Sequence, residues 1–346
     1  MRWRWLVLAA CFSILAVACA KNPLRTYEEQ AAPNFLFDER PFHFDCTERW
    51  PGKPWPALPP GVHSYVTVSP QIPYSYTRLE TLELPRLQVP ALTLATENGA
   101  FVEVSIQGST EDKWELQFCA RGEGNNEAEA RGYLSTVSMS RTGSLVTLDG
   151  GSVGSIGPSG PPGGRGNLLV DAPADAPVTV DSASGAIAVH DMDGPVRLTA
   201  PHARITVLNT TGRVDATGGI VDFAGWKGTV MLTASMETDI KITAQRFEGK
   251  LSAYAIREAR VLVPKGFQTP MELIVSRPKD LICRADICKN MHQKRDGVYR
   301  FFTFAGEDSV AMDRITVRSE SLTVVVDNTE DVVNDRSLRS VPERHQ

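Results

Sequence analysis

The stretch VTVDSASGAIAVHDMDG, residues 178–194, sets the pattern for residues 167–267. It holds two short segments, 178–180 and 187–189, in which two apolar residues flank a third residue and a small polar corner ending in glycine follows. Because side chains on a strand point alternately to opposite faces, each segment places its two apolar groups on one side. A strand with two buried residues does not offset the entropy of ordering it. The stretch therefore predicts strands that become stable only when copies of them stack.

The same pattern recurs at nearly constant spacing. Successive first apolar residues are separated by 10, 9, 9, 9, 9, 6, 10, 10, 11 and 10 residues. A fixed period predicts a repeat architecture, in which each unit buries its apolar face against the next. Glycines at a constant position before the segments supply positive φ and mark sharp corners. The first residues of the segments are Leu168, Val178, Ile187, Val196, Ile205, Val214, Ile220, Val230, Ile240, Leu251 and Val261.

Two architectures fit short strands that recur about every 8–12 residues. One is a coil of stacked parallel strands, and the other is an antiparallel meander of hairpins. The constant position of glycine and the scarcity of two-residue Asn-Gly or Asp-Gly turns favour the coil. We therefore predict an all-β fold, a β-solenoid with a small N-terminal cap and a proline-rich N-terminal arm. The spacing leaves open how many strands make one turn.

The quoted stretch, together with ITVLNTTGRVDATGG at residues 205–219, resembles the DUF4097 and adhesin-head (GIN-like) β-strand repeat family. The resemblance extends over residues 92–328. It implies a single-stranded, right-handed parallel β-helix in an exported or surface-attached protein without an established catalytic role. Two features depart from the family's pattern: the step of six residues between Val214 and Ile220, and the insert around Cys283.

Residues 1–19 are typical of a lipoprotein signal peptide. Arg2 and Arg4 precede an apolar core at residues 6–18, which is too short for a stable membrane span. The sequence LAVAC at residues 15–19 resembles a lipobox, so Cys19 is predicted to carry the lipid. Cleavage by the ordinary signal peptidase is the alternative, because Ala16 stands where leucine is more usual. Either route exports the chain, and we expect a membrane-anchored lipoprotein that is periplasmic or on the cell surface.

Residues 20–90 form the predicted arm or linker. Their twelve prolines argue against a helix or a central strand. A disordered tether rarely carries many aromatic residues, yet this segment includes Phe35, Phe37, Phe42 and Phe44. We therefore expect part of the arm to lie against the folded domain. The alternative is an aromatic strip that binds sugars.

The folded domain is predicted to span residues 91–328. A cap at residues 91–150 contains two strands around a turn at Asn98-Gly99, a strand at 114–118, a short helix at 127–134 capped by Asn125 or Asn126, and a strand from residue 144. A glycine- and proline-rich loop at 150–166 precedes the regular repeats at 167–267. A disulfide-bearing insert at 277–300 is followed by strands within 299–328 that close the far end. Residues 329–346 form a frayed tail.

Four cysteines lie beyond the signal peptide, and an even number in an exported chain favours disulfides. Cys283 and Cys288 close a short loop, which leaves Cys46 and Cys119 to staple the arm to the cap. The rival interpretation is a metal site formed by Cys283, Cys288 and His292. No cofactor is expected.

A net charge of −5 with both signs interspersed gives no basic surface for nucleic acid. Parallel β-helices also host polysaccharide lyases and glycoside hydrolases, which makes Asp181, Asp191 and Asp193, beside His190 and His202, the alternative catalytic candidates. Aspartate at a corner before glycine is also ordinary turn chemistry, and the two histidines are expected to face solvent.

We therefore expect a non-enzymatic, structural or adhesin-like protein of the cell envelope. Its partners would be the membrane, through the lipid anchor, and an envelope protein or polysaccharide. A carbohydrate-active β-helix enzyme and an envelope protein whose arm docks a partner are the alternative functions.

Overall fold

The computed structural model describes Cys46 and residues 62–67, 74–97, 102–150, 163–182, 185–276, 281–304, 313–320 and 323–329. The chain divides into two compact units, residues 1–38 and 39–346, and every described residue belongs to the second unit. The predicted signal peptide, Cys19 and the tail from residue 330 lie outside the described residues. No helix in the described ranges is long and apolar enough to cross a membrane.

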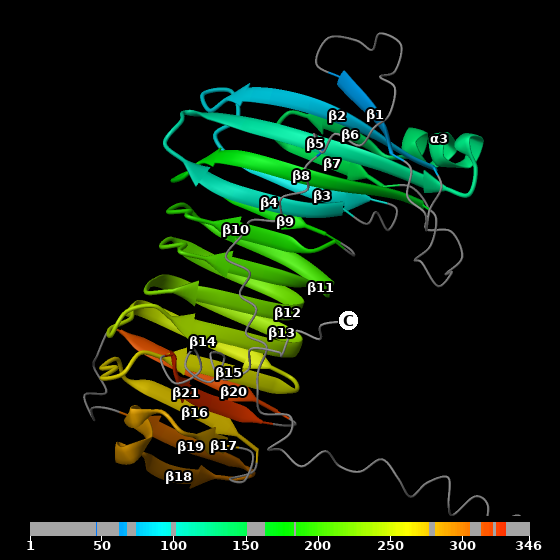
Figure 1. The fold of residues 1–346 in the computed structure, drawn as a ribbon. Helices are drawn as coiled ribbons and strands as arrows, with labels where there is room; N and C mark the ends of the chain where they lie inside the picture. The colour runs from blue at the N-terminus through cyan, green and yellow to red at the C-terminus, as the bar shows by residue number, and fades with distance from the viewer. Residues whose placement is uncertain are drawn as a thin grey trace, which may run out of the picture. The chain divides into compact units, whose positions relative to one another are not determined.

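The described part of the chain is all-β, with one α-helix and one 3-10 helix among 21 strands. The strands form a mixed sheet in which parallel pairings predominate (Figure 1). In chain order the elements are β1 (Val62–Thr67), β2 (Tyr74–Pro85), β3 (Leu92–Glu97), β4 (Val102–Ser109), β5 (Lys113–Gly124), α3 (Glu127–Thr136), β6 (Ser138–Thr142), β7 (Leu145–Asp149), β8 (Gly163–Pro173), β9 (Val178–Asp181), β10 (Ile187–His190), β11 (Val196–Leu208), β12 (Arg213–Gly225), β13 (Lys227–Ile242), β14 (Glu248–Ala255), β15 (Glu258–Val263), β16 (Met271–Val275), β17 (Leu281–Cys283), η2 (Asp286–Asn290), β18 (His292–Asp296), β19 (Tyr299–Phe304), β20 (Arg314–Ser319) and β21 (Val324–Asn328).

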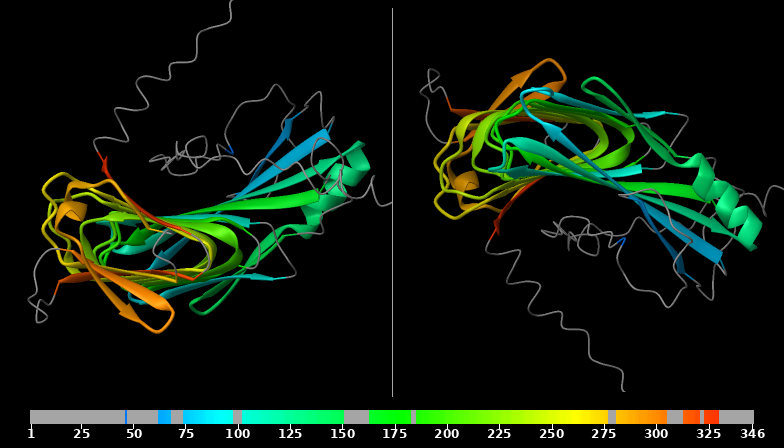
Figure 2. Two further views of the ribbon diagram at one scale, coloured as in Figure 1. Left: turned by 90° about the horizontal axis from the view of Figure 1, so that it is seen from below. Right: turned by 90° about the horizontal axis from the view of Figure 1, so that it is seen from above.

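The pairings sort these strands into two stacks, which we call sheet 1 and sheet 2. The order in sheet 1 is β1-β2-β5-β8-β4-β10-β11-β12-β13-β15-β21-β17. The order in sheet 2 is β6-β7-β3-β9-β11-β12-β13-β14-β20-β16-β19-β18. The long strands β11, β12 and β13 belong to both sheets, because the first half of each pairs in sheet 2 and the second half in sheet 1. Seen along the stack, successive strands lie over one another on two sides (Figure 2).

All pairings among β9 to β15 are parallel. The antiparallel meander is therefore wrong for this region. The inward pairs predicted from the repeat lie in register and are buried, and they stack into two aliphatic rows of one core. The row in sheet 2 is Val178, Val196, Val214, Val230 and Leu251, and the row in sheet 1 is Val189, Val207, Phe223, Ile240 and Val261.

Ile220 is the exception among the first residues predicted to face the core. It lies beside Arg204 and is half-buried, whereas Val221 and Phe223 are both fully buried. The pairing register shifts between Gly218 and Ile220, where β12 turns from sheet 2 to sheet 1. This bulge moves the alternation by one residue, so the short step in the repeat marks an irregular corner.

Glycines stack at one corner, as their constant position in the repeat predicted. The main reason that glycine is needed there is close backbone contact rather than positive φ. A Cβ on Gly212 would lie 2.3 Å from the carbonyl oxygen of Gly194, and one on Gly249 would lie 2.3 Å from that of Gly228. The backbones of successive turns therefore approach too closely for a side chain. Among these stacked corner glycines, positive φ occurs only at Gly228 (134°) and Gly249 (111°).

Both ends of the stack are interleaved. At the start, β3 lies between β7 and β9, and β4 lies between β8 and β10. Near the other end, β20 lies between β14 and β16, and β21 lies between β15 and β17. The prediction that residues 299–328 close the far end is therefore wrong for β20 and β21, which are covered on both edges. The antiparallel strands β19 and β18 pair beyond β16 instead.

Two predictions for the N-terminal part are also wrong. The strands on either side of Asn98-Gly99 do not form a hairpin, because β3 belongs to sheet 2 and β4 to sheet 1. Despite the proline content of residues 20–90, β2 is a central strand between β1 and β5. It begins directly after Pro73 and ends at Pro85, so no proline interrupts its ladder.

The predicted helix is confirmed as α3. The side chain of Asn126 caps it by accepting a hydrogen bond from the backbone N–H of Glu129 at 2.9 Å. The helix buries Ala130 and Leu134. It packs on β5 where Gly122 leaves room, since a Cβ there would lie 2.2 Å from the carbonyl oxygen of Ala130.

Candidate functional site

The outward-facing residues of the two sheets differ in their exposure. In sheet 2, Arg197, Thr217, Met231 and Ser252 are exposed, as expected for a strand whose other side faces the core. In sheet 1, ten residues on the outward side are buried, with exposed fractions of 2–9%, whereas Gln107, Gln117 and Arg204 on the same side are exposed. We call this surface the covered face; it comprises Ser105, Cys119, Ala188, His190, Leu208, Asp222, Ala224, Leu262, Val325 and Asp327.

The covered face contradicts part of the repeat interpretation. Ala188 and Leu262 stand between inward residues, where the repeat places residues mostly able to face water, yet they are 2% and 3% exposed. Met231, in the equivalent position of sheet 2, is 47% exposed. The repeat pattern identifies which residues leave the core, but it does not reveal what lies over them.

A ladder of polar and charged residues crosses the covered face. Thr206, Asp222, Asp239 and Arg260 are direct neighbours on four successive parallel strands, β11, β12, β13 and β15. Neighbouring strands lie about 4.8 Å apart, so the two aspartates are adjacent along the stack. Arg204 binds one oxygen of Asp222 at 2.6 Å, and Oδ1 of Asp222 has no hydrogen-bond partner among the described residues.

Burial controls the protonation of this pair. Desolvation, followed by the negative charge of Asp222, raises the pKa of Asp239 to about 7. The pKa of Asp222 is also raised, chiefly by desolvation, which Arg204 partly offsets. Two carboxylates with unequal partners can thus share one negative charge near neutral pH.

The sequence did not single out either aspartate. The signal was available, because Asp222 lies between Val221 and Phe223 and Asp239 lies between Thr238 and Ile240, all four of them buried. That the two aspartates are neighbours follows only from the pairing register of β12 and β13. The irregular corner at Gly218 shifts this register, so the sequence alone does not give it.

The three aspartates proposed as catalytic alternatives are not brought together. Asp181 ends β9 in sheet 2, whereas Asp191 and Asp193 follow β10 at the other edge of the stack. Asp191 adopts a positive φ of 55°, and Asp193 accepts a hydrogen bond from the hydroxyl of Thr211 at 2.5 Å. These contacts are those of corner residues.

The two histidines beside them have different surroundings. His190 lies on the covered face, so the prediction that it faces solvent is wrong. Burial lowers its pKa, which keeps the imidazole neutral at pH 7. His202 is exposed at the corner within β11.

One disulfide ties the arm to the covered face. Cys46 bonds to Cys119, with a Cα–Cα distance of 5.9 Å. Cys119 lies in β5 and is 4% exposed.

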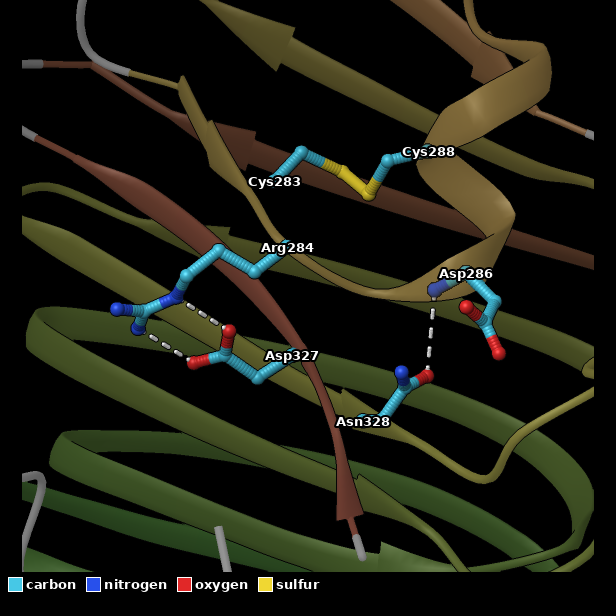
Figure 3. Close-up of a disulfide and its surroundings, with 6 residues drawn as sticks. All are labelled: Cys283, Arg284, Asp286, Cys288, Asp327 and Asn328. Carbon is cyan, nitrogen blue, oxygen red and sulfur yellow. Dashed lines mark hydrogen bonds and ion pairs between the residues drawn. A yellow bond between two sulfur atoms is a disulfide. The ribbon is translucent and has the colours of Figure 1, made fainter. Parts of the chain in front are cut away.

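The second disulfide joins Cys283 and Cys288 across the start of η2 (Figure 3). Beside it, the guanidinium of Arg284 donates two hydrogen bonds of 2.7 Å to Asp327 of β21. Because both cysteines are oxidised, the alternative metal site with His292 is not formed. In the described ranges, no group of three or more His, Cys, Asp or Glu residues is arranged to hold a metal.

No family model and no curated protein match this chain. Among solved structures, it is similar to a proposed cell adhesion protein from Clostridium sporogenes, with 10% identity, a TM-score of 0.33, and coverage of 73% of this chain and 98% of the other. Proposed adhesins from Bacteroides fragilis (9% identity, TM-score 0.23, coverage 72% and 96%) and Parabacteroides merdae (8%, 0.24, 72% and 94%) are also similar. Membership of the DUF4097 family stays a prediction.

Proposed function

We propose that this chain is an exported, non-catalytic protein of the cell envelope, anchored through a lipid on Cys19, that presents sheet 2 to an envelope protein or polysaccharide. The observation that carries the proposal is the contrast between the sheets. The outer face of sheet 2 carries exposed residues on successive strands, whereas ten outward residues of sheet 1 are buried. A ladder of exposed polar and apolar side chains on a rigid support suits an extended partner.

Two further features support the envelope location. The pairs Cys46–Cys119 and Cys283–Cys288 are disulfides, which persist in oxidising compartments outside the cytoplasm. The sequence before Ala20 has the composition of an export signal that ends in a lipobox-like cysteine.

The proposal includes the finer architecture. Residues 178–263 would form a single-stranded, right-handed parallel β-helix with two strands per turn. The parallel register of β9 to β15 supports it, since each of the two sheets gains one strand segment per turn.

Binding tests the role of sheet 2. Arg197→Glu with Met231→Glu should reduce co-sedimentation of the mature protein with isolated envelope material by about tenfold, because both side chains are central and exposed on sheet 2. The matched control is Ile256→Glu with Arg257→Glu, which makes the same charge change at an exposed corner. Equal binding by the sheet 2 variant and the wild type would contradict the proposal.

The anchor and the enzymatic alternative have their own measurements. Mass spectrometry should find a lipid-modified Cys19 as the first residue of the mature chain, and an unmodified N-terminus would exclude the anchor. In a panel of polysaccharides, turnover that is lost on Asp191→Ala with Asp193→Ala would favour the carbohydrate-active enzyme.

A further inference from the structure

We propose that the far end of sheet 2 binds a linear acidic polysaccharide along a row of aromatic and basic side chains. We call this row the aromatic strip; it comprises Tyr254, Arg318, Ile274, Phe301 and Lys294, with Tyr299 beside it. The proposal rests on the role of sheet 2 proposed above, and it adds the position of the site and the chemistry of the partner.

The pairing register aligns the strip across five strands. Tyr254 on β14 lies beside Arg318 on β20, and Arg318 lies beside Ile274 on β16. Phe301 on β19 comes next and is followed by Lys294 on β18. These strands lie together at one end of the stack (Figure 1), and four strand spacings make the strip about 19 Å long. This length suits a segment of an extended polymer.

The apolar members of the strip point away from the core. Each of them is half-buried, whereas the residues that alternate with them are buried, namely Ala253, Ala255, Leu273, Val275, Phe302, Val317 and Ser319. Towards the cap, the same outward row continues as Thr233 and Thr217. The row therefore changes from hydroxyl to aromatic side chains at β14, and a contiguous apolar patch on a polar face marks a contact site.

Arg318 holds the two tyrosines of the strip in place. Its guanidinium lies 4.7 Å from the ring centroid of Tyr299 and 5.9 Å from that of Tyr254. It also donates a hydrogen bond of 2.8 Å to the hydroxyl of Tyr299 and pairs with Glu320 at 3.1 Å. Side chains that are fixed before binding lose little conformational entropy when a ligand packs on them.

The shape of the strip favours a sugar over a protein partner. A standard protein interface buries about 800 Å² on each partner around an apolar core. The strip is only one or two side chains wide, and its border carries the hydroxyls of Ser252, Thr316 and Thr303. A pyranose ring fits this arrangement, because the C–H groups of its face pack on an aromatic ring while its hydroxyls reach the polar border.

The charges around the strip favour an acidic polymer. On the outer side of these five strands, Glu272 is occupied by Arg314 at 2.6 Å. Lys250 and Lys294 have no ion-pair partner among the described residues, and Asp296 is the one outward carboxylate of the described strands here that also lacks a partner. Lys294 is the direct neighbour of Phe301, so it can pair with the carboxylate of a sugar that is stacked on that ring.

Affinity electrophoresis tests the site in the mature protein. The native gels contain polygalacturonate, alginate or hyaluronate, which are linear acidic polysaccharides of different linkage. At least one of them should retard the wild type. Phe301→Ser with Lys294→Ser should raise the dissociation constant by about tenfold or more, because the stacking contact and the ion pair are both lost.

Two variants control for composition and folding. Trp226→Ser with Lys227→Ser removes an exposed ring and a lysine from a corner of the stack, and it should bind like the wild type. Circular dichroism checks the fold of each variant. If the serine pair at 294 and 301 is unfolded, Lys294→Glu alone replaces it, since this position is exposed, and the charge reversal should weaken binding by about tenfold.

Three results in the gels would overturn the proposal. The first is that none of the three polysaccharides retards the wild type, and the second is that the strip variant binds as tightly as the wild type. The third is equal retardation by polyglutamate, which carries carboxylates without sugar rings, because binding would then depend on charge alone.

Co-sedimentation with envelope material separates this site from the proposed function. If Arg197→Glu with Met231→Glu loses binding while the strip variant keeps it, the proposed function stands and the strip is wrong. If both variants bind the envelope like the wild type while the strip variant loses the polysaccharide, the strip stands and the envelope role is wrong. Binding that is lost after protease treatment of the envelope, but not after periodate oxidation of its sugars, would identify a protein partner and overturn the proposal.

Discussion

Asp239→Asn should remove a large part of the pH dependence of stability between pH 4 and pH 7. The folded protein holds a proton on Asp239 up to about pH 7, whereas the unfolded chain releases it near the ordinary value of 3.8. Over this window the folded state binds more protons, so stability falls as the pH rises and is constant above it. The shift corresponds to about 4 kcal/mol, and the asparagine variant should gain up to that amount relative to the wild type at pH 8.

Urea unfolding at pH 4.5, 6, 7 and 8 measures this difference. Asp222 contributes a change of the same sign, but it is present in both proteins and largely cancels when they are compared. Asp181→Asn on exposed sheet 2 is the control and should follow the wild-type curve. Parallel curves for Asp239→Asn and the wild type would show that Asp239 ionises freely, as in an uncovered sheet.

Phe223→Ala should destabilise the protein by about 3–5 kcal/mol. The ring is fully buried between the two sheets and meets Phe247 edge-on, with ring centroids 6.4 Å apart. Its deletion leaves a cavity in a row of stacked side chains, because the flanking residues Val207 and Ile240 are held by their own strands.

Chemical denaturation measures the loss, with Met231→Ala as the control on the exposed side of sheet 2. That variant should stay within about 0.5 kcal/mol of the wild type, since half of its surface is already in water. A small effect at Phe223 would mean that the alternation in β12 follows Ile220, as the repeat alone predicts, and that Phe223 faces outward.

Much of the central stack could be predicted from sequence because its information is local. The alternation of apolar residues fixes which side of each segment faces the core, and the glycines mark one corner of each turn. Helix α3 was likewise predictable, since its cap and first turn are adjacent in sequence. At Ile220 the same reasoning failed, because a single extra residue in a corner reverses the alternation.

Long-range order was beyond the sequence pattern. The structure places β20 between β14 and β16, whereas the sequence order suggests that it is the last strand of the stack. The local sequence does not distinguish these positions, because edge and interior strands carry the same pairs of apolar residues. The Asp222–Asp239 ladder has the same origin, since two acidic residues 17 positions apart become neighbours only through the register of β12 and β13.

The strand pairings and the burial pattern together distinguish the two outer surfaces of the stack. The interleaved ends protect strand edges, ten outward residues of sheet 1 are buried, and the outer side of sheet 2 carries exposed residues. This division also explains why desolvation dominates the pKa values of residues on sheet 1, including His190.

The two sheets depend on parallel stacking in which β20 and β21 insert between earlier strands. Cysteine cross-linking tests this arrangement most directly. Thr316 lies directly between Ser252 and Glu272 on the outer side of sheet 2, so Ser252 and Glu272 are two strand spacings, about 10 Å, apart. Ser252→Cys with Thr316→Cys should form a disulfide on mild oxidation, detected by peptide mapping, whereas Ser252→Cys with Glu272→Cys should not. The opposite result, a bond from 252 to 272 and none from 252 to 316, would place the strands in chain order and contradict the structure described above.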